Sequence, residues 1–322
     1  FPWLSNPEYQ AKRAIAVIPC EVCNSQSGTE YLGSAIANEI CTQLSLIKGF
    51  QVKSYTSSSR YMGPDKPSMQ NIGRELGANY IIEGSIERQF DDVSIHVQVI
   101  LAQEDDHIWA REFKGEWADI FKIRADISKM LAEELKISLS PEEKELIEKI
   151  PTASLSAYDV FQRGNEQYIK YLNNPNDFEA LEEAKDYFRR ALQLDPEYAQ
   201  VYARLAGIYF IENRMSNEFF GKNYLDSARY FAEKALKYDN ETSEALVVMG
   251  DYYRENGNLE QALKEYNDAL KINPNSWEAY RGKAHVYRDD DNLAFIENAL
   301  KASDLTRGTE RLVIEKDLMT IY

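Results

Sequence analysis

The chain has 322 residues and a formal net charge of −16, and its 44% hydrophobic content is ordinary for a globular protein with room for two domains. The acidic excess argues against binding to nucleic acid, which needs clustered basic side chains, and against adhesion to anionic lipid. The sequence contains no run of about 18 apolar residues, so no segment is expected to span a membrane.

The N-terminal part alternates between predicted strands and helices. Residues 14–19 form an apolar run typical of a buried strand, and residues 93–99 alternate between apolar and polar side chains as a half-buried strand does. This order predicts an α/β domain over residues 1–140, in which helices cover a mixed sheet. The other strands are expected over residues 50–55, 80–86 and 108–113, and the helices over residues 29–47, 66–76 and 118–136.

Residues 141–153 are expected to be a charged helical connector, and residues 154–322 are predicted to be all helical. Within them, residues 243–276 show the 34-residue pattern of a tetratricopeptide (TPR) repeat, a helical hairpin that stacks on copies of itself and builds a binding surface. The positions that carry this pattern are Leu246, Met249, Gly250, Tyr253, Ala262, Tyr266, Ala269 and Pro274.

About four such repeats are expected, and three of them are irregular. Extra residues around 173–176 and 213–222 lengthen the first and second hairpins. The fourth repeat begins at Trp277, and its second helix, near residues 292–304, fits the pattern poorly. A final helix over about 309–321 either caps the stack or begins a truncated repeat.

Four positions of each first helix face the concave side in TPR stacks, and this register predicts a groove that is aromatic at one end and basic at the other. Its arginines would hold a carboxylate by charge-assisted hydrogen bonds, so the expected partner is a protein or an acidic peptide segment. The alternative is that the arginines are solvated or pair with local acids such as Glu278. The predicted lining is Tyr158, Phe161, Asn165, Tyr168, Phe210, Asp251, Arg254, Arg281, His285 and Arg288.

Three other motifs have both a functional and a structural interpretation, and we favour the structural one for each. Cys20 and Cys23 form a C-x-x-C pair, but no second pair or nearby histidine completes a zinc site. The loop Ser57–Arg60 could bind phosphate, or its serines could bond the backbone of a turn. The run Asp289–Asn292 lacks the glycine and distant glutamate of a calcium loop, so it is expected to cap the following helix.

No catalytic residue, cofactor or metal is predicted. The common nucleotide-binding, phosphate-binding and zinc-hydrolase motifs are absent from the sequence. His96, His107 and His285 are far apart in the sequence and have no partner at a motif spacing. We therefore expect a protein that binds without catalysis.

Several segments of the N-terminal part form a linked pattern: residues 14–19, Tyr31-Leu32-Gly33 with Ile36 and Glu39, and residues 55–61, 72–85 and 107–111. In this order they resemble the TolB-like (FlgO-like) amino-terminal domain of bacterial proteins. Residues 119–123 and 151–164 also fit the way this domain continues into TPR units. Cys20 departs from that family, which usually carries an aromatic residue there.

The resemblance implies a sensory or partner-binding portion of a bacterial signalling protein. Similar proteins carry a DNA-binding domain or a class III adenylate cyclase ahead of this tandem, commonly with one membrane span between them. Because the sequence begins at Phe1 without a methionine, we expect it to be a piece of a longer protein, with membrane attachment only through an upstream span. An extracytoplasmic location is favoured, whereas the three unpaired cysteines favour a reducing compartment.

Two alternatives remain at this stage. One is a stand-alone envelope scaffold, and the other is a small-ligand or enzymatic role for the N-terminal domain through the serine loop or the cysteine pair. The sequence leaves the oligomeric state open, and a homodimer is compatible with it.

Overall fold

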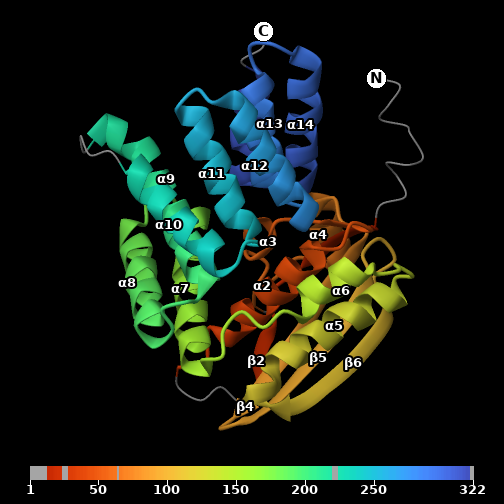
Figure 1. Ribbon diagram of the computed structural model, residues 1–322. Helices are drawn as coiled ribbons and strands as arrows, with labels where there is room; N and C mark the ends of the chain where they lie inside the picture. Colours follow the sequence, from red (N-terminus) through yellow and green to blue (C-terminus); the bar gives the residue numbers. More distant parts are fainter. Residues whose placement is uncertain (1–12, 24–27, 64, 220–223, 320–322) are drawn as a thin grey trace. The chain divides into compact units, whose positions relative to one another are not determined.

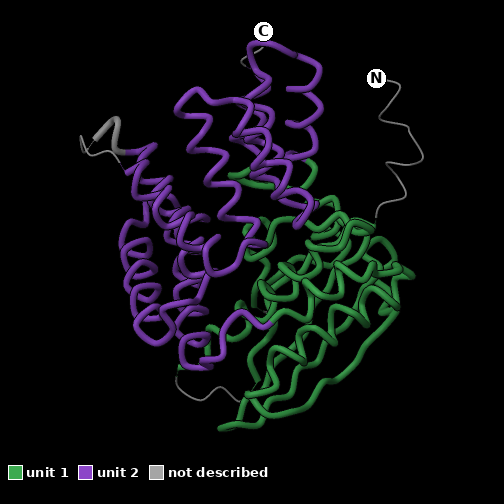
Figure 2. Tube along the Cα trace, viewed as in Figure 1, with its two compact units in different colours: residues 1–149, 304–310 green, residues 150–303, 311–322 purple. Residues whose placement is uncertain are grey.

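The computed structural model describes residues 13–23, 28–63, 65–219 and 224–319. The chain divides into two units, each defined by contacts within itself (Figure 2). Unit 1 contains residues 1–149 and 304–310, and unit 2 contains residues 150–303 and 311–322. The predicted connector lies across this division, since its helix belongs to unit 1. None of the helices in the described ranges is long and apolar enough to cross a membrane.

Unit 1 is built around a mixed sheet. The strand order is β3-β1-β4-β5-β6, and β2 pairs with β4 beside β1. β1 runs parallel to β3 and β4, whereas β4, β5 and β6 form an antiparallel meander. The strands are β1 (Arg13–Val17), β2 (Glu21–Cys23), β3 (Phe50–Val52), β4 (Tyr80–Gln89), β5 (Asp92–Leu101) and β6 (Asp106–Glu116).

Helices cover both sides of β1 because its side chains are apolar on both faces. Ala16 and Ile18, two residues apart, pack with Ile72 and Leu76 of α4 on one face of the sheet. Ile15, which alternates with Ala16 along β1, is fully buried toward the other face, where α2 and α5 lie (Figure 1). The helices are α2 (Leu32–Ser45), α3 (Tyr55–Ser58), α4 (Met69–Leu76), α5 (Ile120–Glu134), α6 (Pro141–Glu148) and the 3₁₀ turn η2 (Trp117–Asp119).

A short C-terminal segment, residues 304–310, completes unit 1. The Ser54 amide donates to the Leu305 carbonyl at 2.8 Å, and Lys53 Nζ donates to the Asp304 carbonyl at 2.6 Å. Ser57 Oγ accepts from the Arg307 amide at 2.7 Å and lies 3.0 Å from Glu310 Oε2. The chain therefore returns to the α/β unit after the helical repeats, which the sequence pattern does not predict.

Unit 2 consists of successive helical hairpins, so the predicted fold class, an α/β part followed by a helical repeat part, is confirmed. The final helix α15 (Thr309–Met319) follows the fourth hairpin. The hairpins are α7 (Leu155–Asn173) with α8 (Phe178–Leu194), α9 (Ala199–Phe219) with α10 (Leu225–Tyr238), α11 (Ser243–Glu255) with α12 (Leu259–Ile272), and α13 (Trp277–Tyr287) with α14 (Asn292–Leu305).

One ring sets the spacing of the first helices. Tyr266 of α12 is fully buried between Gly250 of α11 and Gly282 of α13. A Cβ atom on Gly250 would lie 2.6 Å from the ring, and one on Gly282 would lie 2.3 Å from it. The missing side chains thus let consecutive first helices approach the same tyrosine. Gly164 of α7 approaches Phe188 of α8 in the same way.

We predict that Gly282→Ala destabilises the protein, although alanine favours helix by about 1 kcal/mol. Overpacking against Tyr266 costs about 1–3 kcal/mol and outweighs that gain. The matched control is Gly207→Ala in α9, where the nearest heavy atom to an added Cβ is Tyr168 Oη at 3.7 Å. Thermal denaturation should show a lower Tm for Gly282→Ala and a higher one for Gly207→Ala. Two equal increases would contradict the packing argument.

A second prediction concerns Glu310, where burial raises the pKa to about 7 against hydrogen bonds from Ser54, Ser57 and Thr56 that lower it. Because the folded-state pKa lies above the unfolded value of 4.5, this contribution to stability is fully present below pH 4.5 and is lost as pH rises through about 7. Docking of residues 304–310 should therefore weaken between pH 5 and pH 8, as measured by intrinsic-rate-corrected hydrogen exchange of the Leu305-bonded amide of Ser54.

Glu310→Gln provides the control for this measurement, because it keeps an acceptor for Ser57 and removes the titration. Its corrected exchange should be flat across the same pH range. A variant profile that follows the parent profile would show that another group causes the effect.

Candidate functional site

The residues predicted to line the groove fall into two groups. Some are buried in the helical core, and others lie on the surface formed by the first helix of each hairpin, which we call the first-helix face. Phe161 packs between Phe188 and Tyr198, with ring centroids at 5.6 and 5.0 Å. Phe210 belongs to the core shared by the second and third hairpins, and Tyr158 is only 1% exposed. These three side chains offer no open surface, because in the irregular hairpins the positions assigned to the groove turn toward the core. The expected aromatic end is thereby reduced to Tyr168.

Around Tyr168 the first helices carry polar side chains. The Arg204 guanidinium lies over the Tyr168 ring, 5.9 Å from its centroid, and Arg204 Nε donates to Asn165 Oδ1 at 3.1 Å. Asn165 also contacts Gln162, so its amide is held from two sides. This pair joins α7 to α9, the first helices of successive hairpins.

The third hairpin contributes a partly buried carboxylate, Asp251, that accepts hydrogen bonds from two donors. Tyr266 Oη donates to Asp251 Oδ1 at 2.8 Å, and an Arg254 nitrogen donates to the same oxygen at 3.3 Å. Arg254 also forms an ion pair with Glu255 at 2.8 Å. Burial and the Asp251 charge raise the pKa of Tyr266, so this hydroxyl remains a donor. The residue that fixes helix spacing thus also fixes Asp251.

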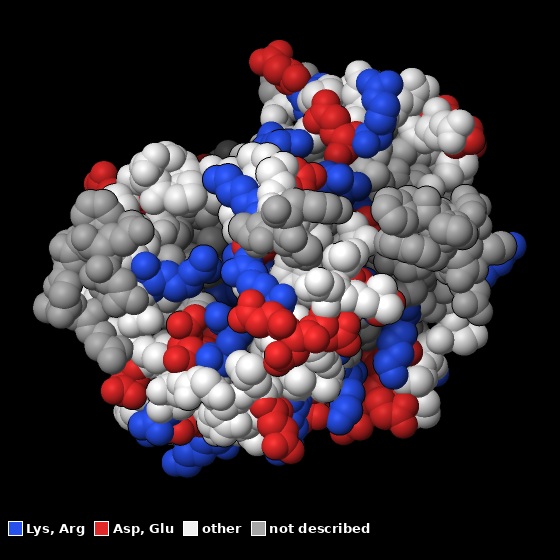
Figure 3. Space-filling model, turned by 90° about the horizontal axis from the view of Figure 1, so that it is seen from above, with Lys and Arg blue, Asp and Glu red and all other residues white. Residues whose placement is uncertain are grey.

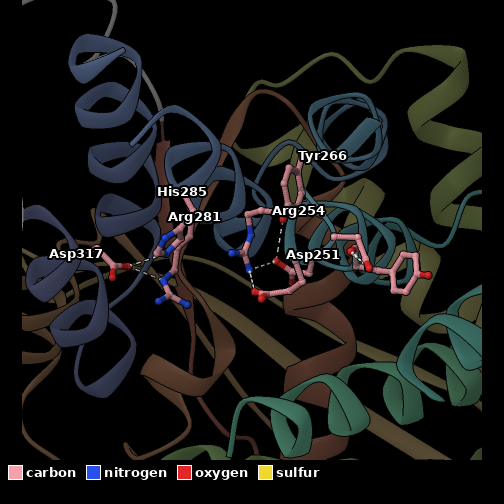
Figure 4. A network of polar contacts seen from close by, with 9 residues as sticks. Asp251, Arg254, Tyr266, Arg281, His285 and Asp317 are labelled. Atoms are coloured by element: carbon pink, nitrogen blue, oxygen red, sulfur yellow. Dashed lines mark hydrogen bonds and ion pairs between the residues drawn. The ribbon is translucent and has the colours of Figure 1, made fainter. Parts of the chain in front are cut away.

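Two basic side chains of α13, Arg281 and His285, converge on the Asp317 carboxylate of α15 (Figure 4), and Arg288, the residue that caps the C-terminus of α13, lies near the same carboxylate. Arg281 Nε donates to Asp317 Oδ2 at 2.8 Å, and His285 Nε2 lies 3.1 Å from the same oxygen. Arg288 lies 3.6 Å from Asp317 Oδ1. Their spacing along the helix places all three on one face. We call Arg254, Arg281, His285 and Arg288 the basic cluster.

Electrostatics favour the ionised form of Asp317. Burial alone raises its pKa, but hydrogen bonds from His285 and Arg281, together with their charges, outweigh burial and lower the pKa to about 2. Asp317 is therefore a carboxylate at neutral pH. The contact is both a charge-assisted hydrogen bond and an ion pair, the strongest class of side-chain hydrogen bond.

Arg214 of α9 extends the positive field of the cluster. Desolvation and the neighbouring charge of Arg281 lower its pKa, and the charge of Arg254 adds to this effect. Asp251 and Asp317 act in the opposite direction. Charged side chains of four helices therefore act on one another electrostatically. These helices are α9, α11, α13 and α15.

Sequence reasoning identified the basic residues but missed Asp317, Arg214 and the role of the Tyr266 hydroxyl. Asp317 lies 36 residues after Arg281, and Arg204 lies 39 residues after Asn165. A search for opposite polar groups about one repeat apart would have found both pairs. Glu278, which the alternative interpretation offered as an example of a local acid, accepts a hydrogen bond from Ser276 at the start of α13, and the acids that pair with the arginines include Glu255 and Asp317.

Cys20 and Cys41 are buried thiols of low reactivity. Burial raises the pKa of Cys20 to about 12, and the charge of Glu83 adds to this. Burial likewise raises the pKa of Cys41 to about 12. Such thiols stay protonated at neutral pH and are poor nucleophiles. Cys23 lies on the exposed side of β2, and all three cysteines are free thiols.

The serine and aspartate motifs make internal hydrogen bonds. Ser58 Oγ donates to the Val17 carbonyl at 2.6 Å, and Ser59 Oγ donates to the Thr56 carbonyl at 3.0 Å. The first two residues of the predicted serine loop belong to the short helix α3, and Ser59 caps it. Asp291 Oδ1 accepts from the amides of Leu293 and Ala294 at 3.1 and 3.0 Å. The capping interpretation of the acidic run is confirmed. Within the described ranges no group of His, Cys, Asp and Glu could hold a metal ion.

One hollow in unit 1 bears on the small-ligand alternative. It lies at one end of the β4–β6 meander and has a volume of about 580 Å³. It is open and bordered by carboxylates with a single lysine. Its lining is Glu87, Gln89, Asp92, Val93, Ser94, Lys114, Gly115, Glu116 and Asp119.

Surface charge is mixed on one face of the molecule. In Figure 3, Lys and Arg side chains lie among Asp and Glu side chains on the described part of that face. The basic cluster belongs to a chain whose net charge is −16.

Comparisons with known proteins identify the helical repeats. A family profile described as "TPR repeat" matches residues 250–289, and one described as "Tetratricopeptide repeat" matches residues 179–198. The protein named "Putative adenylate cyclase 3" of Rhizobium meliloti (strain 1021) is 28% identical over 200 residues, 62% of this chain and 33% of that protein. This chain thus spans about a third of the length of that relative.

Two solved structures show a weaker likeness. "Crystal structure of MamA" has 16% identity and a TM-score of 0.28, covering 57% of this chain and 99% of that one. "MamA RS-1 ArsTM double mutant" has 17% identity and a TM-score of 0.32, covering 59% and 95%. The profile matches establish the essential point: the C-terminal part of this chain contains TPR repeats, which are protein-interaction modules.

Proposed function

We propose that this chain is a non-enzymatic, partner-binding and sensory module of a bacterial signal-transduction protein. Its TPR helices bind an acidic segment of a partner protein, and binding regulates an output domain that lies outside this sequence. The basic cluster carries the proposal, because three of its members already hold a carboxylate at hydrogen-bonding or ion-pair distance.

Two observations support the signalling setting. The N-terminal residues resemble the TolB-like domain, which occurs beside regulators and class III cyclases. The relative that covers 62% of this chain is named an adenylate cyclase, and the remaining two thirds of that protein provide room for an output domain. Both observations concern relatives, so the nature of the output is part of the proposal.

Regulation by binding requires two states of the module with different affinities for the partner. A carboxylate of the partner would favour the state in which the side chains of the basic cluster face that carboxylate. The coupling free energy would then equal the difference between the binding free energies of the partner in the two states. The proposal assigns no chemistry to these residues, because the cluster lacks a nucleophile paired with a base.

We predict that Arg281→Ala with Arg288→Ala weakens binding to the partner about tenfold. A charge-assisted hydrogen bond contributes about 1.5–3 kcal/mol, but the free chain also loses the contacts of these side chains with Asp317, so only part of this energy is lost from binding. A difference of 1.4 kcal/mol corresponds to a tenfold change in Kd. The partner is first identified by photo-crosslinking from position 168, and Kd is then measured by calorimetry with the purified partner.

The matched control removes two arginines from a second helix, Arg189→Ala with Arg190→Ala in α8. It changes the net charge equally and leaves the first-helix face intact, so its Kd should match that of the parent. Full affinity in the Arg281 and Arg288 variant, with native circular dichroism, would rule out the groove as the binding site.

A further inference from the structure

The carboxylate held by the basic cluster belongs to the chain itself. Asp317 accepts from Arg281 and lies within reach of His285 and Arg288, and its side chain is 16% exposed. Two guanidinium groups and an imidazole around one carboxylate make a complete recognition site for an acidic side chain. In the described structure, that site is occupied from within.

The cluster has more donor capacity than Asp317 uses. Arg254 Nε and Arg288 Nε are buried, and none of the described groups accepts a hydrogen bond from either. The positive charges of Arg281 and Arg254 also act on Arg214. A ligand with several carboxylates would satisfy more of these donors than one aspartate does.

The helix that carries Asp317 is held by few apolar contacts. Ile314 is its only fully buried apolar residue among those described; it packs with Ala284 and Phe295, and the partly buried Leu318 lies against the same cluster. Leu312 and Met319 on the same helix are 56% and 71% exposed. An element with so little buried apolar surface opens at low free-energy cost compared with the core helices.

We infer that α15 is a displaceable internal competitor, in which Asp317 occupies the carboxylate site until a partner segment rich in glutamate or aspartate replaces it. This inference rests on the proposed function for the nature of the partner. The exchange swaps one carboxylate for another at Arg281 and His285, and it releases α15 from the first-helix face. Binding of the partner and release of α15 are then the same event.

The test uses the full chain and a fluorescein-labelled pentaglutamate peptide, with pentaglutamine as the uncharged control. Asp317→Asn should bind pentaglutamate about tenfold more tightly than the parent by fluorescence anisotropy, since the competing charge is gone. Glu315→Gln is the matched control, because it makes the same charge change on α15 but removes only the ion pair with Arg311. Its affinity should equal that of the parent.

Two further measurements separate competition from a merely structural role. Asp317→Glu keeps the carboxylate and should restore parental affinity. Saturating pentaglutamate should speed hydrogen exchange in residues 311–319 of the parent. A ligand bound elsewhere would leave the exchange rate of these residues unchanged or lower it. Adding Arg281→Ala and Arg288→Ala to Asp317→Asn should abolish the gain.

Equal or weaker binding by Asp317→Asn, or slower exchange of α15 with peptide, would overturn the inference. A stronger response to inorganic phosphate than to pentaglutamate would do so as well. These outcomes do not depend on whether a partner protein is captured. If a partner is captured but Asp317→Asn does not change the affinity for pentaglutamate, only the inference that α15 is an internal competitor is rejected. A tenfold gain without a captured partner keeps the carboxylate site and rejects the signalling role.

Discussion

The contact of Tyr266 with Gly250 and Gly282 is the constraint on which the candidate site depends. A side chain at either glycine would meet the ring at less than 3 Å, so the two first helices can share the tyrosine only because both positions lack a Cβ atom. The hydroxyl of the same ring donates to Asp251, which in turn accepts from Arg254. Helix spacing and the orientation of one arginine are thereby set by a single residue.

The position of the basic cluster in an acidic chain limits how a partner reaches it. A net charge of −16 repels an acidic partner at long range, and at physiological salt that field is screened over about 8 Å. Attraction then comes only from the cluster itself, at contact distance. Such a site contributes to specificity and to the lifetime of the complex more than to the rate of encounter.

Much of this architecture could be predicted from the sequence, because periodicity records which residues share a face. The 34-residue pattern located α11 and α12, and alternation located β5. Periodicity shows that a residue lies on an apolar helix face, but it does not show whether that face meets the core or lines the groove. Phe161 and Phe210 were therefore assigned to the groove although their rings fill the core.

Short or distant pairings left no local signal in the sequence. Strand β2 has three residues, too few for alternation to show, and its place follows from pairing with β4. The return of residues 304–310 to unit 1 depends on backbone carbonyls that accept from Lys53 and Ser54, and every residue type has such a carbonyl. Asp317 could be found only by asking what lies one repeat beyond Arg281.

The internal carboxylate also determines which ligands the cluster can select. Arg214 is repelled by the charges of Arg281 and Arg254, and Asp251 and Asp317 offset part of that repulsion. Replacing Asp317 by one carboxylate of a partner exchanges like for like and contributes little net free energy. The gain must come from groups that Asp317 leaves unsatisfied, above all the buried Nε–H groups of Arg254 and Arg288. A cluster protected in this way discriminates against single acidic side chains and favours segments that present two or more carboxylates together.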